Sequence, residues 1–204
     1  MSTHSDFGAD YAAEQLARQR SPLRRLIKAR YVQRVLRHVQ GPTIDVGCGA
    51  GQILEKLPAG SVGLEVNPYL IASLRERGLN VRQIDATGDR INLAGIVSGQ
   101  YRTLVLSHVL EHFVHAEAVL QRLLQDCAIL GLDTVIVVVP GLAGYQSDAT
   151  HRTFVHPDWL SQHDLQRQGQ FALAEQDWFP VNAAWPGRYF AYHELHLVYR
   201  RNAA

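Results

Sequence analysis

The sequence predicts an α/β fold: a doubly wound, mostly parallel sheet of seven strands, with helices on both faces and an antiparallel hairpin at the C-terminal end. Short apolar runs alternate with amphipathic stretches as far as Gly169, and a glycine-rich loop follows the first apolar run. Two further strand-like runs then close the chain. Alternating strands and helices are typical of parallel sheets, whereas consecutive strands usually pair antiparallel.

Capping residues and breakers mark where each element begins and ends. Ser21 and Pro22 suit the start of a helix, Gly41 and Pro42 end it, and Gly131 ends a later one. The expected strands begin at residue 43 and cover residues 61–66, 80–84, 101–106, 134–139, 171–178 and 193–200. The expected helices cover residues 22–39, 53–57, 69–77, 116–130 and 157 to about 167, after an earlier turn at 11–18.

Length and composition predict one compact domain, residues 1–204, in which residues 1–40 form an N-terminal helical extension. Cys48 and Cys127 stand far apart with no Cys-x-x-Cys pair, which argues against a zinc ribbon or a disulfide scaffold. The longest aliphatic run, Val135 to Val139, is too short to cross a bilayer. We therefore expect a cytoplasmic protein without a membrane span, and its oligomeric state stays open.

Basic residues crowd into the N-terminal segment although the net charge is only +1. One interpretation is that these basic residues form the solvated face of an amphipathic helix. Leu23, Ile27, Tyr31 and Val35 would then point inward. Binding of an anionic substrate or of RNA is the other. No aromatic residues interleave with the basic ones, as a single-stranded nucleic-acid platform would need, so nucleic acid is the weaker option.

The glycine-rich loop follows the first strand and indicates a nucleotide-like ligand. Its sequence, from Asp45 to Gly51, is Asp-Val-Gly-Cys-Gly-Ala-Gly. A dinucleotide fingerprint would need its third glycine at position 52, which is Gln52. The segment resembles the first motif of the class I S-adenosylmethionine-dependent methyltransferases. That motif consists of an acid, any residue and then Gly-x-Gly-x-Gly. The resemblance, closest to the type 11 and type 12 small-molecule groups, implies a Rossmann-like methyltransferase fold and S-adenosyl-L-methionine as cofactor.

Residues at the ends of consecutive strands should line one crevice, because ligands of open α/β sheets bind at the carboxyl ends of the strands. Glu65 ends the second strand, where a carboxylate can accept hydrogen bonds from ribose hydroxyls. The resemblance implies that Asp85 and Ala86 meet the adenine ring. The expected cofactor-binding residues are Asp45, Gly47, Cys48, Gly49, Gly51, Glu65, Val66, Asp85, Ala86 and Ser107.

The fourth strand runs into Ser107, His108 and then Glu111 and His112. His-x-x-Glu-His is also an inverzincin metal motif, but that motif needs a long helix and a distant third ligand, so we assign no metal from the sequence. The string resembles the fourth motif of small-molecule methyltransferases. Some ubiquinone-pathway O-methyltransferases hold a divalent ion at this corner, and whether this chain does so stays open.

A polar loop follows the fifth strand. It resembles a loop that lies over the acceptor pocket in type 11 and type 12 methyltransferases, and this resemblance implies that His151 and His156 are acceptor-side candidates. A neutral histidine could remove the proton from an oxygen or nitrogen acceptor, and we expect His151, then His112, as that base. A histidine that only ties the loop to backbone carbonyls would look the same in the sequence.

Taken together, these residues predict a methyltransferase that acts on a small molecule, a sugar or a lipid-linked acceptor, by O- or N-methylation. Two alternatives are a non-catalytic S-adenosylmethionine-binding partner subunit and an NAD-dependent oxidoreductase. The sequence does not identify the acceptor.

Overall fold

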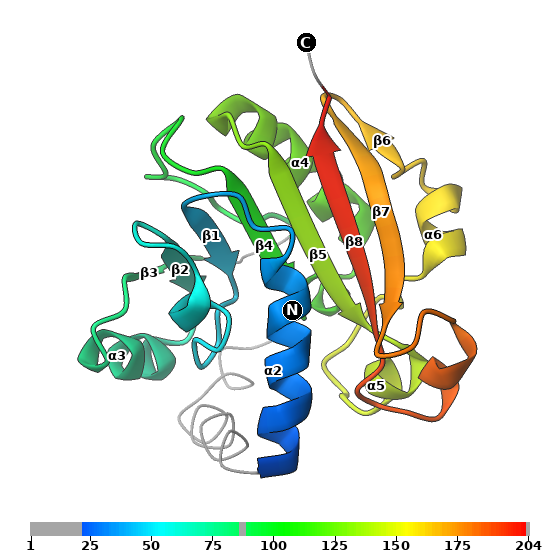
Figure 1. The fold of residues 1–204 in the computed structure, drawn as a ribbon. Coiled ribbons are helices and arrows are strands. Elements are labelled where there is room, and N and C mark those ends of the chain that lie inside the picture. Colours follow the sequence, from blue (N-terminus) through cyan, green and yellow to red (C-terminus); the bar gives the residue numbers. More distant parts are fainter. Residues whose placement is uncertain (1–21, 86–88, 203–204) are drawn as a thin grey trace.

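The computed structural model describes residues 22–85 and 89–202, and within the first helix the side chains from residue 29 onward. Its strands form one sheet in the order β3-β2-β1-β4-β5-β8-β7-β6, parallel from β3 to β5 and antiparallel beyond (Figure 1). The predicted fold class is therefore confirmed, and a two-residue eighth strand adds to it. The strands are β1 (Thr43–Val46), β2 (Val62–Glu65), β3 (Val81–Gln83), β4 (Thr103–Ser107), β5 (Thr134–Pro140), β6 (Arg167–Gln168), β7 (Phe171–Phe179) and β8 (Glu194–Arg201).

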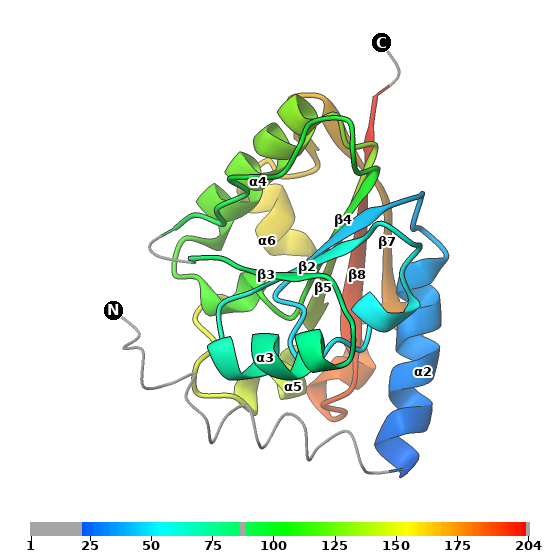
Figure 2. The same cartoon turned by 90° about the vertical axis from the view of Figure 1, so that its left-hand side faces the viewer.

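Helices cover both faces of this sheet. Figure 2 shows the sheet nearly edge-on, with α2 on one side and α4 and α6 on the other, while α3 packs against β2 and β3. The α-helices are α2 (Pro22–Leu36), α3 (Pro68–Glu76), α4 (Ala116–Leu130), α5 (Leu142–Gln146) and α6 (Pro157–Gln162). The described ranges also contain three single 3-10 turns: η2 (Leu54–Lys56), η3 (Leu110–His112) and η4 (Trp185–Arg188).

The central strand β5 shows why the sheet needs helices on both faces. All seven of its residues are buried, as a continuous β-branched run predicts for an internal parallel strand. Val135 and Val137 belong to the core beneath α4, whereas Ile136 and Val138 pack with Val35 of α2. Successive side chains point to opposite faces of a strand, so each helix layer is matched to alternate residues.

Local capping sets the helices that lead to the site. Asn67 is the N-cap of α3, and its Oδ1 accepts hydrogen bonds from the backbone N–H groups of Tyr69 (2.9 Å) and Leu70 (3.3 Å). Gly131 follows α4 in the left-handed conformation, φ 79°. The predicted bounds of α4, residues 116–130, are confirmed at both ends.

Other predicted bounds are wrong in part. The last helix was expected to reach about residue 167 but ends at Gln162, because Asp164 takes a left-handed conformation (φ 52°) and the N–H of Leu165 bonds back to Leu160. Arg167 then lies in strand β6. Similarly, α2 stops at Leu36, and α5 forms where only a loop was expected.

The N-terminal expectations are tested only where the chain is described. Tyr31 and Val35 are buried, as predicted, and Arg34 pairs with Asp177 of β7. The expected turn at 11–18 and the inward side chains of Leu23 and Ile27 lie outside the described residues. No helix in the described ranges is long and apolar enough to cross a membrane.

We propose that α2 belongs to the same folding unit as the sheet, and Val35→Ala tests this. Val35 is fully buried against β4 and β5, so its truncation should lower the free energy of unfolding by about 1–3 kcal/mol. Denaturant unfolding should keep a single transition. Gln33→Ala, on the exposed side of α2, is the matched control and should change stability by less than about 0.5 kcal/mol. A second, separate transition would show that α2 folds apart from the sheet.

Candidate functional site

The glycine-rich loop leaves β1 at the carboxyl edge of the sheet. Gly47, Gly49 and Gly51 all have positive φ, 65°, 54° and 81°. At Gly47 two requirements coincide, because a Cβ there would also overlap the side chain of Val109. The N–H of Gly47 donates to the carbonyl of Leu64 at 2.7 Å, so the loop is bound to the end of β2.

Glu65 ties the glycine loop to the start of α3. Its carboxylate is buried, and Oε2 accepts a hydrogen bond from the N–H of Gly49 at 2.8 Å. Oε1 accepts from the N–H groups of Val66 (2.9 Å) and Asn67 (3.0 Å). A carboxylate has about four acceptor positions, so these three bonds leave it capacity for a ligand hydroxyl. Glu65 therefore holds the glycine loop in place.

Asp45 lies next to Glu65 and is poorly satisfied. Its side chain is buried, and Oδ2 has no hydrogen-bond partner within the described structure. Burial, followed by the charge of Glu65, raises the pKa of Asp45 to about 8, although a hydrogen bond from the backbone of Leu54 opposes the shift. A ligand with N–H donors or positive charge would complement this acid pair.

The other expected cofactor-binding residues differ in burial and in their contacts. Cys48 is buried, and burial raises the pKa of its thiol well above the ordinary range. Ser107 ends β4 and hydrogen-bonds with the hydroxyl of Tyr31 on α2. Asp85 is exposed two residues beyond β3, and Ala86 lies outside the described residues.

A second group of polar side chains forms where β4 ends, beside the glycine loop. His108 has a left-handed backbone, φ 54°, which is uncommon for a residue other than glycine. Its Nδ1 lies 3.4 Å from Oε1 of Glu111, and its Nε2 lies 3.0 Å from Oε1 of Glu194 on β8. Burial opposes protonation of His108, but the nearby carboxylates of Glu111 and Glu194 outweigh it and raise its pKa.

The predicted acceptor residues His112 and His151 come together at this corner. Their rings meet edge to face with centroids 4.8 Å apart, and Nε2 of His151 lies 3.8 Å from Oε1 of Glu111. Burial lowers the pKa of His112, which favours the neutral imidazole. His156 instead takes the N-cap position of α6, and its ring stacks on Phe154.

Sequence reasoning missed the residues that hold this corner in place. The carbonyl of Tyr145 accepts a hydrogen bond from Nδ1 of His151 (2.8 Å), and Thr150 Oγ1 lies 3.1 Å from Nδ1 of His112. Thr150 in turn donates to Asp148 at 2.6 Å. None of these partners stands in a motif, and only the fold of α5 and the loop after it brings them to η3.

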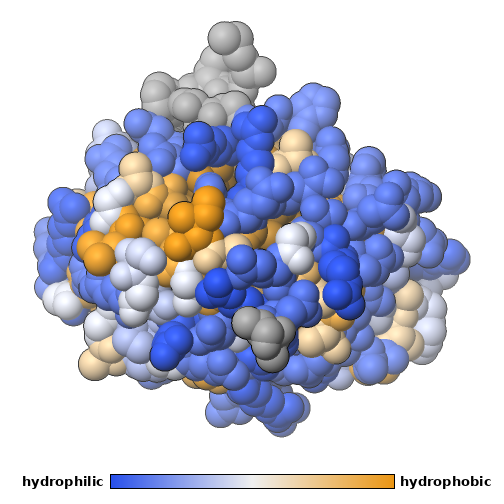
Figure 3. All heavy atoms as spheres, turned by 90° about the horizontal axis from the view of Figure 1, so that it is seen from above, coloured by the Kyte–Doolittle hydropathy of each residue, from blue (hydrophilic) through white to orange (hydrophobic). Residues whose placement is uncertain are grey.

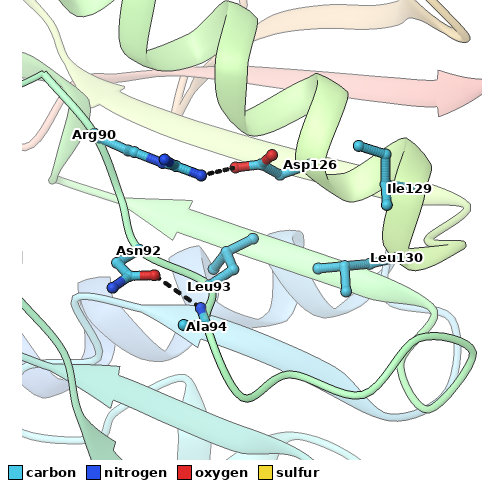
Figure 4. Close-up of a pocket in the computed structure, with 7 residues that line it drawn as sticks. All are labelled: Arg90, Asn92, Leu93, Ala94, Asp126, Ile129 and Leu130. Atoms are coloured by element: carbon cyan, nitrogen blue, oxygen red, sulfur yellow. Dashed lines mark hydrogen bonds and ion pairs between the residues drawn. The ribbon is translucent and has the colours of Figure 1, made fainter.

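A shallow pocket of about 220 Å³ lies elsewhere, between the segment before β4 and the end of α4 (Figure 4). Its polar groups already bind one another: Arg90 pairs with Asp126 at 3.9 Å, and Asn92 accepts from the N–H of Ala94 at 2.9 Å. Figure 3 looks onto the end of the molecule opposite the glycine loop and shows apolar side chains gathered on one side of it. We assign no chemistry to this pocket.

The buried acid pair predicts a stability penalty in the ligand-free protein, which Asp45→Asn should remove. Folded Asp45 keeps its proton up to about pH 8, whereas the unfolded chain releases it near pH 3.8. Folding therefore takes up a proton between these values, and the stability of the natural protein falls as pH rises. Asp45→Asn should raise the free energy of unfolding by about 1–3 kcal/mol at pH 8 and by less at pH 5.

Urea unfolding at both pH values measures this effect. Asp126→Asn is the matched control, because its carboxylate is partly exposed in a long ion pair with Arg90. If Asp45→Asn is less stable than the natural protein at both pH values, the carboxyl has a partner that the structure does not show.

Comparison with solved structures finds the same fold in methyltransferases. Magnesium protoporphyrin IX methyltransferase (ChlM) from Synechocystis PCC 6803, with bound SAH, has a TM-score of 0.62 at 14% identity, over 97% of each chain. N-methyltransferase NodS from Bradyrhizobium japonicum WM9, with S-adenosyl-L-homocysteine, has a TM-score of 0.63 at 12% identity, over 94% of this chain and 98% of that one. A third match comes from the complex between the Haloferax volcanii Trm112 methyltransferase activator and a methyltransferase. It has a TM-score of 0.68 at 14% identity, over 99% of each chain.

These likenesses establish the fold of S-adenosylmethionine-dependent methyltransferases, and they agree with the expected cofactor. A search of the curated proteins found no significant match. The family model described as "Methionine biosynthesis protein MetW" matches residues 28–146, which is more than half of the chain and includes the glycine loop, Glu65 and η3. The chain belongs to the MetW family.

Proposed function

We propose that this protein is an S-adenosylmethionine-dependent methyltransferase that methylates an oxygen or nitrogen of a small molecule, a sugar or a lipid-linked acceptor. The observation that carries the proposal is the bond between Glu65 and Gly49. It places a buried acid from the end of β2 against the glycine loop from the end of β1. A nucleoside with free ribose hydroxyls suits an acid in this position.

The donor side of the chain fits this cofactor. The loop from Gly47 to Gly51 would hold its methionine portion, and Glu65 its ribose. Asp85 would lie near the adenine. Oδ2 of Asp45, which has no hydrogen-bond partner in the described ranges, supports the assignment, since the cofactor carries an ammonium group and a sulfonium. When bound, the cofactor supplies an activated methyl group on sulfur.

On the acceptor side, the chain's own task is to position the acceptor and deal with its proton. Val109 contacts Gly47, so the corner with Glu111, His112 and His151 adjoins the donor loop. Tyr145 fixes Nδ1–H of His151, which leaves the lone pair on Nε2. This tautomer supports the predicted base role, and methyl transfer in line needs little beyond such positioning.

A second candidate function is an S-adenosylmethionine-binding subunit that acts through a partner. Two observations favour keeping it. The MetW family match ends at residue 146, before His151, so the family model does not cover the acceptor loop. One structural neighbour comes from a complex with a methyltransferase activator. An NAD-dependent oxidoreductase is the weaker alternative because of Gln52.

Donor binding tests the shared part of both candidates. Isothermal calorimetry should show one site for S-adenosylmethionine and none for NAD. Glu65→Ala should weaken binding at least about tenfold, because it removes a charged hydrogen-bond acceptor worth about 1.5–3 kcal/mol. Glu117→Ala, a carboxylate on α4 away from the loop, is the control and should bind normally. NAD binding at the same site would contradict the proposal.

Methyl transfer separates the two candidates. With methyl-labelled donor and a panel of small acceptors, His112→Asn/His151→Asn should lower kcat by about 10²–10⁴-fold while the Kd for the donor stays within a factor of about two. Turnover that is unchanged at saturating donor would exclude both histidines as bases. If no acceptor is labelled although the donor binds tightly, the result favours the partner-subunit candidate over the methyltransferase.

A further inference from the structure

Ligand atoms of Glu111, His112 and His151 lie close together. One oxygen or nitrogen from each lies within 4.8 Å of the others. Two ligands on one tetrahedral ion, each about 2.1 Å from it, are about 3.4 Å apart, so small rotations would bring this set into contact with a single ion. Two imidazoles and one carboxylate form a donor set that zinc and other first-row divalent metals accept.

The Glu111 carboxylate is an independent sign of a missing cation. Its side chain is 1% exposed, and neither oxygen has a hydrogen-bond partner in the described parts of the chain. The nearest basic nitrogens, Nδ1 of His108 at 3.4 Å and Nε2 of His151 at 3.8 Å, are beyond good hydrogen-bond length. His108, whose pKa is raised, brings one positive charge near Oε1 but makes no short hydrogen bond to it. A buried carboxylate is costly unless its oxygens are also directly bonded, and a metal ion would bond to them.

The outer partners of the two histidines match those of metal ligands. Nδ1 of His151 donates to the carbonyl of Tyr145, so its lone pair is on Nε2, which faces Glu111. Nδ1 of His112 meets Thr150 Oγ1, whose own proton goes to Asp148. Thr150 therefore accepts from His112. Histidines that bind metals usually donate their second nitrogen to a carbonyl or a carboxylate-linked group in this way.

The backbone also fixes η3 to the acceptor loop. The N–H groups of Arg152 and Thr153 both donate to the carbonyl of Glu111, at 2.7 and 3.1 Å. The side chain of His151 is thus held next to those of Glu111 and His112, although His151 lies 39 residues beyond His112 in sequence. This arrangement supplies the distant ligand that the His-x-x-Glu-His string alone lacks.

We propose that Glu111, His112 and His151 bind a divalent transition-metal ion that receives the methyl acceptor through an oxygen atom. The role of the acceptor rests on the proposed methyltransferase function; the metal site itself does not. An acceptor hydroxyl bound to the ion loses its proton to water, and its oxygen then forms the new bond to the methyl carbon as the carbon–sulfur bond breaks and a thioether remains. With the ion bound, both histidine lone pairs are on the metal, so water takes the base role proposed for the two histidines.

Metal titration of tag-free protein tests the site without reference to activity. After treatment with EDTA, Co²⁺ or Zn²⁺ should bind with one ion per chain, and Co²⁺ should give the visible absorption of a site with nitrogen ligands. Glu111→Gln and His151→Asn should each weaken binding at least about 100-fold. Thr150→Val should weaken it by about 10–100-fold through His112. His115→Asn, an exposed histidine in the same part of the chain, is the matched control and should bind like the natural protein.

Circular dichroism and thermal melting of each variant show that it is folded, and calorimetry with S-adenosylmethionine on the same samples separates the two proposals. If protein that binds the donor holds no stoichiometric metal, the metal site is overturned and the methyltransferase proposal is not. Equal metal binding by the natural protein and by His151→Asn also overturns the metal site, as does turnover that EDTA leaves unchanged but His151→Asn abolishes. Metal binding without donor binding supports the site and overturns the methyltransferase proposal.

Discussion

The Glu65 carboxylate is the interaction on which the arrangement of the donor site depends. Three backbone N–H groups, those of Gly49, Val66 and Asn67, converge on its two oxygens. The bond to Gly49 fixes a loop whose glycines need positive φ, and the bond to Asn67 steadies the N-cap of α3. Placing this carboxylate beside Asp45 costs stability, because Asp45 is also buried and its Oδ2 has no hydrogen-bond partner among the described residues. A protein keeps such a cost where a ligand makes use of it.

The donor and acceptor sides are mechanically connected through the turn after β4. The left-handed conformation of His108 turns the chain from β4 into η3, with Val109 against Gly47 and Glu111 facing His151. The same histidine reaches Glu194 on β8, and Tyr31 of α2 bonds to Ser107 just before it. Elements from the two ends of the chain therefore support one corner. A substitution at this turn should affect both halves of the site, as expected for residues that share contacts.

Sequence patterns predicted the parts of the fold that depend on local chemistry. The bounds of α4 were correct because an amphipathic run ends at a glycine that can adopt positive φ. The end of α6 was not, because Asp164 takes the same conformation without a glycine to signal it. The glycine loop and Glu65 were recognisable as motif residues, but the bond between them depends on how β1 and β2 pair. The proximity of His112 and His151 could not be read from the sequence, since only α5 and the loop after it determine it.

Hydrogen exchange of the natural protein, measured with and without S-adenosylmethionine, tests the central claim most directly. The account predicts slower exchange of backbone amides in residues 45–51 and 62–67 when the cofactor is present, because the ligand would lie on amides that Glu65 already holds in place. Exchange in β8 should not change. Unaltered exchange in both segments at saturating S-adenosylmethionine, or equal protection by NAD, would contradict the account.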